Sequence, residues 1–178
     1  MEKRIGLIGA TASDFFAREL LPIIDRHRYA WYGWTIPIRK EILPVLRKQG
    51  SFNLYGYSSS GCYPNPKDAT HKVEAVFIVD ASKIKSHWDT GRDANPCPEP
   101  EKAIRGPNDF FTYKYEVREY PKLFRQPRRT WFAVVNAKKL QPALDLSDNI
   151  FTPWNSRHKI HTSPLRSWFI DIVDNLAI

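Results

Sequence analysis

The amino-acid sequence predicts one α+β domain over residues 1–178, built on a small barrel-like or strongly bent mixed sheet with flanking helices. The length is sufficient for a single domain with a proper core. Apolar residues make up 42% of the chain and aromatic residues 13%, which indicates a globular protein rather than a disordered one. Strand-like and helix-like segments follow one another irregularly, without repeats or a low-complexity tail, and this order favours α+β.

The N-terminal part of the chain combines a helix with a strand. The residues "TASD" (11–14) form a Ser/Thr-x-x-acid capping box, which predicts a helix through "FFARELL". Pro22 should disturb the end of that helix, because proline lacks the amide proton that a helix uses. The following "YAWYGW" (29–34) is rich in aromatic side chains and predicts a strand.

A second helix is predicted within "PIRKEILPVLRKQG" (37–50). Gly50 is a typical stop signal at its end. Pro44 should bend or split this helix, since a proline in a helix interior removes a hydrogen bond. The apolar face consists of Ile38, Ile42, Val45 and Leu46.

Three further strands and a closing helix complete the prediction. The strands are expected over 52–60, 72–84 and 130–140. A proline-rich excursion over 85–110 precedes the last of them, and long excursions in compact domains are often functional. The final segment, 163–178, predicts a helix capped by Ser163 with one apolar face, made of Leu165, Trp168, Phe169, Ile172 and Leu176.

The charge distribution indicates a polyanionic partner. Lys and Arg number 27 against 19 Asp and Glu, which gives a net charge of +8 at pH 7. Half of that excess falls within 114–131, where aromatic residues are interleaved with the basic ones. Basic side chains contact phosphates and aromatic rings stack on bases, so we expect a nucleic-acid partner. The phosphate-binding candidates in this stretch are Lys122, Arg125, Arg128 and Arg129, and the alternative for each is a solvated basic face.

No motif of a dinucleotide-binding enzyme is complete. The start "IGLIGAT" has Gly6 and Gly9 before a helix, but Ala12 stands where a third glycine is needed. The strand and helix alternation of a nucleotide-binding fold does not continue either. We therefore expect no cofactor, and we expect Gly9 to serve a turn.

Catalytic and metal-binding patterns are equally weak. His158 and His161 lie three residues apart, but no Cys-x-x-Cys or His-Glu-x-x-His motif accompanies them. No Asp or Glu has a lysine two residues later, as many nucleases require, and no nucleophile-elbow glycines frame the serines at 58–60. We therefore expect a protein that is not an enzyme and holds no metal. The two cysteines, Cys62 and Cys97, the lack of a secretory signal and the lack of a long apolar run favour a reduced, cytoplasmic protein without a membrane span.

Three tryptophan-containing segments carry a resemblance to a known family: "YGWTIPIRKEILPVLRK" (32–48), "SHWDT" (86–90) and "FTPWNSRHKI" (151–160). The last of them resembles the Asn-Pro-Trp-Asn-Glu-x-Lys-Pro stretch of YTH domains, which are readers of N6-methyladenine. "YGWTIPIRKEILPVLRK" (32–48) is similar to the segment in which Gly-x-Trp-(Ser/Thr) precedes a proline and a Lys-rich helix, and "SHWDT" (86–90) resembles the later His-Trp segment. The similarity runs in islands from about Tyr29 to Ile160. It implies a divergent YTH-like fold within the PUA-like group, which also includes EVE and ASCH domains.

The resemblance implies an aromatic cage for a methylated base. Trp34 and Trp88 would form its walls, with Thr35 beside the base. Stacking of a flipped base is worth about 1–3 kcal/mol, and burial of the added methyl group about 0.8 kcal/mol more. In a duplex the base must first be extruded from the stack. Such a cage recognises its ligand without catalysis; the alternative for each tryptophan is ordinary core packing.

The resemblance also assigns roles around the "TPWN" turn. It implies that Trp154 faces inward and supports the fold. Arg157 and Lys159 would then lie beside the nucleic-acid backbone as further phosphate-binding candidates.

The nature of the nucleic acid stays open at this point. YTH domains read RNA, and related modules target modification-dependent restriction systems of the McrBC type to methylated DNA. The end "DNLAI" carries no polar cap or tail, and we therefore expect the chain to be the N-terminal module of a longer protein, with a catalytic or ATPase domain after it. The alternative is a general RNA- or DNA-binding, or RNA-modifying, PUA-like protein of the ASCH or EVE type. The Gly-x-Lys-x-x-Glu-x-Arg run of ASCH domains is not supplied by "PIRKEILPVLRK".

Overall fold

The computed structural model of the chain describes residues 3–11, 15–34, 36–58, 72–103, 128–147, 149–154, 160, 169–176 and 178. Its central element is one mixed sheet, in which the strands follow the spatial order β2-β5-β4-β3-β1-β7-β6. The strands are β1 (Ile5–Thr11), β2 (Ala30–Trp34), β3 (Ser51–Ser58), β4 (Lys72–Ser86), β5 (Thr130–Asp145), β6 (Thr152–Pro153) and β7 (Ile170–Val173).

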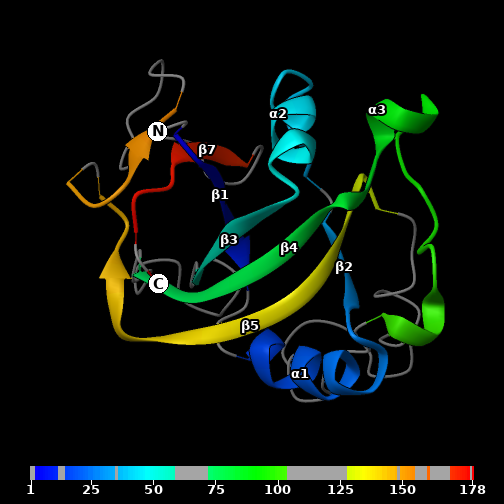
Figure 1. Cartoon of the computed structure of the whole chain (residues 1–178), viewed down its shortest axis with the longest axis horizontal. Helices are drawn as coiled ribbons and strands as arrows, with labels where there is room; N and C mark the ends of the chain where they lie inside the picture. The colour runs from blue at the N-terminus through cyan, green and yellow to red at the C-terminus, as the bar shows by residue number, and fades with distance from the viewer. Residues whose placement is uncertain are drawn as a thin grey trace, which may run out of the picture.

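The described sheet is open and strongly bent. β1 and β3 pair in parallel, and the other neighbouring strands pair antiparallel. Figure 1 shows β4 and β5 as long, curved ribbons that run across the molecule. The predicted α+β class with a bent mixed sheet is confirmed. The barrel alternative is wrong, because β2 and β6 end the strand order on opposite sides and do not pair with each other.

Two apolar layers, together with a smaller cluster around Trp31 and Trp131, cover the faces of the sheet. Successive side chains of a strand point to opposite faces, so Leu54 and Tyr55 of β3 belong to different core clusters. The first layer is covered by the two longer helices, which contribute Leu20 and Leu46 among others. The second layer includes Phe151, whose ring contacts that of Tyr55 with centroids 5.4 Å apart. Because both faces are buried, the central strands read as nearly continuous apolar runs.

The two prolines disturb the helices less than the sequence predicts. The described part contains α1 (Phe15–His27), α2 (Ile42–Gln49), α3 (His87–Thr90) and a 3-10 turn, η3 (Pro100–Lys102). α1 continues through Pro22 to His27, so this proline does not end it. Pro44 lies in the first turn of α2, where an amide proton has no acceptor within the helix, so Pro44 causes neither a bend nor a split. Gly50 ends α2 with φ 78°, as predicted. No helix described here has the length and apolarity that crossing a membrane requires.

The end of the chain contains a strand where the sequence predicts a helix. Ile170–Val173 forms β7 and pairs antiparallel with β1, while 161–168 lies outside the described residues. The residues Ile-Asp-Ile-Val also fit the alternation of a strand, and the edge of β1 supplies the hydrogen-bond partners that favour it.

Gly9 lies inside β1 and not in the turn that the sequence suggested. A Cβ atom at this position would lie 2.7 Å from Cε1 of Phe169 and 3.0 Å from Cζ3 of Trp34. Glycine therefore leaves room for two aromatic rings on the face of β1.

Candidate nucleic-acid interface

Three segments that carry predicted site residues meet at one end of the sheet. The strand register pairs Trp34, the last residue of β2, with Thr130, the first residue of β5. It pairs the same Thr130 with Ser86, the last residue of β4. Arg128 and Arg129 directly precede Thr130, and Trp88 follows Ser86 by two residues. The fold therefore brings residues from three distant parts of the sequence to one corner.

An irregularity in β4 directs the strand toward this corner. The pairing of β4 with β5 shifts between Asp80 and Lys85, so that residues 81–84 leave the regular ladder. Ala81 N donates instead to the carbonyl oxygen of Gly50 at 3.0 Å. Irregularities of this kind re-aim a strand, and here β4 turns into α3.

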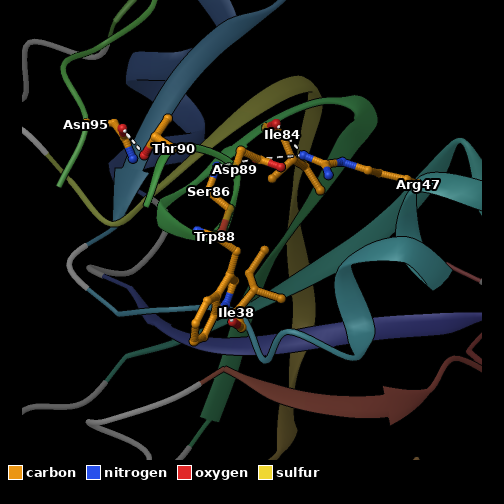
Figure 2. Close-up of polar contacts among 8 residues, drawn as sticks. All are labelled: Ile38, Arg47, Ile84, Ser86, Trp88, Asp89, Thr90 and Asn95. Atoms are coloured by element: carbon orange, nitrogen blue, oxygen red, sulfur yellow. Dashed lines mark hydrogen bonds and ion pairs between the residues drawn. The ribbon is translucent and has the colours of Figure 1, made fainter. Parts of the chain in front are cut away.

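A capping box and an ion pair hold α3 in place (Figure 2). Trp88 N donates to Ser86 Oγ at 3.2 Å, and Ser86 N donates to Asp89 Oδ2 at 2.9 Å. Arg47 of α2 donates to the same carboxylate oxygen at 2.7 Å and to the Ile84 carbonyl oxygen at 3.1 Å. Burial alone would raise the pKa of Asp89, but the hydrogen bonds from Arg47 and Ser86 hold that pKa below its ordinary value. The corner that carries Trp88 is thus tied to α2.

Trp88 presents an exposed ring in a fixed orientation. Its side chain is 42% exposed, which is unusual for a tryptophan. The indole N–H donates to the Ile38 carbonyl oxygen at 2.7 Å (Figure 2). The His87 ring lies beside it, with centroids 4.1 Å apart, and the Lys40 ammonium lies 5.9 Å from the ring centroid. An oriented indole with a neighbouring cation is suited to stacking on a base next to a phosphate.

Trp34 differs from Trp88 because it is buried. Its side chain is 6% exposed and packs among the first core layer. The ring centroid lies 4.7 Å from that of Tyr32 and 5.0 Å from that of Phe169. Its indole N–H is buried and has no acceptor among the residues that the structure describes. A buried donor of this kind calls for an explanation, and a ligand acceptor is one.

Two hydrogen bonds hold the segment that follows Trp34. Thr130 Oγ1 donates to the Ile36 carbonyl oxygen at 3.0 Å, and Trp88 donates to that of Ile38. Both donors belong to the corner described above, so residues 36–38 line it. Thr35, which joins Trp34 to this segment, lies outside the described residues.

The stem of Arg128 packs against Gly33 of β2. A Cβ atom on Gly33 would lie 2.7 Å from Cγ of Arg128 and 2.6 Å from Cζ3 of Trp131. The backbone of Arg128 exchanges two hydrogen bonds of 2.8 Å with that of Asn95. Burial lowers the pKa of Arg128, but a guanidinium remains charged in proteins. The fold thus fixes a partly buried cation against Gly33 and Trp131, on the face of β2 opposite to the Trp34 side chain.

Arg129 is exposed and adjoins α3. Its carbonyl oxygen accepts a 2.9 Å hydrogen bond from His87 N. Burial of the imidazole, together with the charge of Arg129, lowers the pKa of His87 below its ordinary value. A neutral His87 therefore lies against Trp88 at pH 7, while Lys40, Arg128 and Arg129 supply positive charge to this corner.

The described part of the long excursion is anchored rather than loose. Trp131 Nε1 donates to the Asn95 carbonyl oxygen at 2.8 Å. Thr90 Oγ1 donates to Asn95 Oδ1 at 2.8 Å (Figure 2). Further along, Glu99 accepts hydrogen bonds from Tyr29, from Trp31 at 2.9 Å and from Lys102 at 2.7 Å. These contacts fasten residues 95–102 to β2 and β5. Because Asn95 is bonded to the backbone of Arg128, they also hold Arg128 in place.

The remaining predicted residues are placed as follows. Lys122, Arg125, Arg157 and Lys159 lie outside the described residues, as do Cys62, His158 and His161. Trp154 is 38% exposed, so the expectation that it faces inward is wrong. Trp154 directly follows the two-residue strand β6, and its N–H donates to the Asp171 carbonyl oxygen of β7. This bond holds Trp154 at the surface of the sheet. Within the described ranges no three His, Cys, Asp or Glu side chains gather as a metal site.

Sequence reasoning missed two residues of this corner. Lys40 lies over the Trp88 ring, and the Ile38 carbonyl oxygen orients that ring by accepting its indole N–H. The basic pair in "PIRK" was the available signal for Lys40. A backbone carbonyl leaves no signal in a sequence, so the part played by Ile38 comes from the structure alone.

No protein-family model matches the chain, and no curated protein matches it. A similar solved structure is the N-terminal domain of Staphylothermus marinus McrB. It is 12% identical to this chain with a TM-score of 0.40, and the match covers 90% of this chain and 84% of that one. Similarity of this extent identifies no ligand.

Proposed function

We propose that the chain is a non-catalytic nucleic-acid reader that holds an N6-methyladenine base at the corner formed by β2, β4 and β5. The carrying observation is the register, which pairs Trp34 with Thr130 and Thr130 with Ser86. This register brings the two tryptophans of the YTH-like segments to the same end of the sheet. Arg128 and Arg129 adjoin them. Aromatic rings beside guanidinium groups suit a base and its phosphate.

The two tryptophans would act differently on the base. Trp88 offers an exposed, oriented ring for stacking. Trp34 offers a buried indole N–H without an acceptor among the described residues, and the ring nitrogens of adenine are acceptors. Thr35, between Trp34 and the anchored segment 36–38, is proposed to lie beside the base. The methyl group adds apolar area worth about 0.8 kcal/mol and removes an N–H that would need a partner.

The phosphates would be held on both sides of this corner. Arg128 and Arg129 are proposed as direct phosphate ligands, and Lys40 joins them through its place above Trp88. Lys122, Arg125, Arg157 and Lys159 remain proposed phosphate ligands on their sequence alone. The target is DNA or RNA, and a separate catalytic or ATPase partner would carry out any cleavage.

One observation favours a second candidate function. Trp34 is buried against Tyr32 and Phe169, as a core residue would be. In this alternative Trp88 alone stacks on bases, and the chain binds nucleic acid without regard to methylation, as a general PUA-like binder of the EVE or ASCH type would.

Fluorescence anisotropy titrations with matched oligonucleotides separate the two functions. DNA and RNA strands, single and double, are compared with and without one N6-methyladenine. The reader should prefer the methylated strand by at least about fourfold, the equivalent of 0.8 kcal/mol. Equal affinity for both strands would refute the reader and leave the general binder.

The variants locate the preference within the corner. Trp34→Phe should reduce the preference for the methylated strand, since it removes the indole N–H. Phenylalanine is chosen because alanine at a buried tryptophan costs about 3–5 kcal/mol of stability and can unfold the protein. Arg128→Ala should weaken binding of the methylated and the unmethylated strand equally, because Arg128 is proposed to contact only the phosphate backbone. It is therefore the matched control.

A further inference from the structure

A pocket opens on the far side of α2 from the Trp88 corner. Its volume is about 520 Å³, within the roughly 300–1,000 Å³ typical of ligand sites. The N-terminal end of β1, the last turns of α2 and the turn after β6 line it. Figure 1 shows α2 between α3 and the start of β1 along one side of the molecule.

The lining combines an exposed aromatic ring with positive charge. Trp154 contributes its indole, and Lys3, Arg4 and Lys48 contribute three cations. Among the described residues that line this pocket there is no carboxylate. Concentrated positive charge attracts phosphate, and an exposed indole attracts a flat apolar ring. A nucleotide carries both groups.

The floor of the pocket is rigid. Gln49 at the end of α2 accepts a 2.7 Å hydrogen bond from Ile5 N and donates one of 3.0 Å to the Ile5 carbonyl oxygen. Arg4 donates to the Ser51 carbonyl oxygen at 3.1 Å. The side-chain amide of Gln49 thus joins α2 to the start of β1 in the manner of a neighbouring strand, so the two backbones that carry these cations are held together.

A chain of contacts connects this pocket with the Trp88 corner. Trp154 N donates to the Asp171 carbonyl oxygen, and the Asp171 carboxylate forms a 2.8 Å ion pair with Arg39. Arg39 directly follows Ile38, whose carbonyl oxygen holds Trp88. Two exposed tryptophans are therefore linked through one segment, residues 38–39. On the other side of α2, Arg47 holds α3 while its neighbour Lys48 lines the pocket.

We infer that the Trp154 pocket, formed by Trp154, Lys3, Arg4 and Lys48, is a second subsite for the same nucleic-acid strand. A nucleotide flanking the one at Trp88 would stack its base on Trp154 and place its phosphate among the three cations. This inference rests on nucleic-acid binding as proposed above, but it does not depend on recognition of the methyl group. The subsite reads no methylation and adds affinity to any base.

The test compares a long strand with a short one. Binding of the whole chain is measured by anisotropy to a single strand of about 12 nucleotides and to a trinucleotide, each with and without one N6-methyladenine. Trp154→Ala should lower affinity for the long strand by about 5- to 140-fold, the equivalent of one stacked base, in both methylation states. It should leave trinucleotide binding at the Trp88 corner unchanged. Trp154→Phe, which keeps a ring, should retain most of the affinity.

The charges are tested separately from the ring. Lys48→Gln and Lys3→Gln should each reduce the slope of log K against log salt by about 1 for the long strand. Lys138→Gln, an exposed lysine of β5 outside the pocket, is the matched control and should leave the slope unchanged. The exposed lysines can be changed without disturbing the core. The lysine variants therefore still test the subsite if Trp154→Ala does not fold.

The outcomes distinguish this inference from the proposed function. If Trp154→Ala and Lys48→Gln both bind the long strand with wild-type affinity, the second subsite is overturned. A preference for the methylated strand in the same measurements would still support the proposed reader function. Equal affinity for methylated and unmethylated strands, together with losses in the pocket variants, would overturn the reader and support the subsite. A chain that binds none of the strands would overturn both.

Discussion

Trp88 donates its indole N–H to the carbonyl oxygen of Ile38 at 2.7 Å, across 50 residues of sequence. The bond holds an exposed ring in one orientation, and the capping box of Ser86 and Asp89 holds the backbone beneath it. Exposed tryptophans on loops ordinarily lose rotamer freedom when they bind a ligand. Here much of that ordering is already present, which favours stacking on a base.

Removal of the Trp88 ring should weaken binding without unfolding the protein. We expect Trp88→Ala to lower affinity for a single strand by about 5- to 140-fold, since one stacked base is worth about 1–3 kcal/mol. Trp88→Phe keeps a ring but loses the hydrogen bond to Ile38, so its affinity should lie between those of the wild type and Trp88→Ala. Anisotropy titrations measure both. Equal binding by all three proteins would rule out Trp88 as a stacking platform.

Gly33→Ala should destabilise the fold. The new Cβ atom would lie 2.6 Å from Trp131 and 2.7 Å from Arg128, closer than real Cβ contacts allow. Overpacking of this kind costs about 1–3 kcal/mol, measurable as a lower midpoint in urea unfolding. The variant should also weaken nucleic-acid binding, because Arg128 must move. An unchanged midpoint would mean that β2 and β5 can separate more easily than their register suggests.

Arg129→Ala should change the salt dependence of binding rather than methyl preference. Loss of one phosphate contact reduces the slope of log K against log salt by about 1. Arg129 is exposed, so its removal should leave the urea midpoint close to that of the wild type. The experiment is a series of titrations at increasing salt, with Lys138→Gln as the control. A slope that stays constant in Arg129→Ala would place the phosphates elsewhere.

Glu99 should make stability depend on pH in the acid range. Hydrogen bonds from Lys102, Tyr29 and Trp31 lower the pKa of Glu99 from 4.5 to about 2. Because the folded-state pKa is depressed, the stabilisation is fully present above pH 4.5 and is lost as the pH falls from there toward 2.

Glu99→Gln isolates this effect. The difference in urea midpoint between wild type and variant should be largest above about pH 5 and should shrink toward zero near pH 2. Taking the difference removes the contribution of the other carboxylates. A difference that is independent of pH would show that the contacts of Glu99 do not depend on its charge.

The sequence predicted the parts of the fold that depend on local patterns. Ala30–Trp34 is a strand and Gly50 ends α2 because composition and capping act within a few residues. The segment 170–173 could not be decided in this way, since its apolar spacing fits a helix and a strand equally. Its pairing with β1, nearly the whole chain away, selects the strand. The same limit applies to Gly9, whose role depends on Phe169 and Trp34.

The residue types of the candidate site could be predicted from the sequence, but the solvent exposure of its tryptophan side chains could not. Aromatic and basic residues in polar company indicated Trp88, Arg128 and Arg129, and the register brings them together. The resemblance to YTH domains assigned Trp34 to the cage and turned Trp154 inward. The structure shows that Trp34 is buried, which the resemblance did not specify, and that Trp154 is exposed. Exposure of a tryptophan depends on which rings pack against it, and no local pattern encodes that.

The position of β1 has a consequence for how the chain folds. β1 lies between β3 and β7, and its pairing with β7 joins Ile5 to Val173. Contacts between such distant residues form slowly, because a long loop must close before they stabilise anything. Until β7 docks, β1 presents an unpaired strand edge that can capture another chain. The newly made protein should therefore be most prone to aggregate in the interval before its last described strand arrives, when Phe169 has not yet covered Gly9.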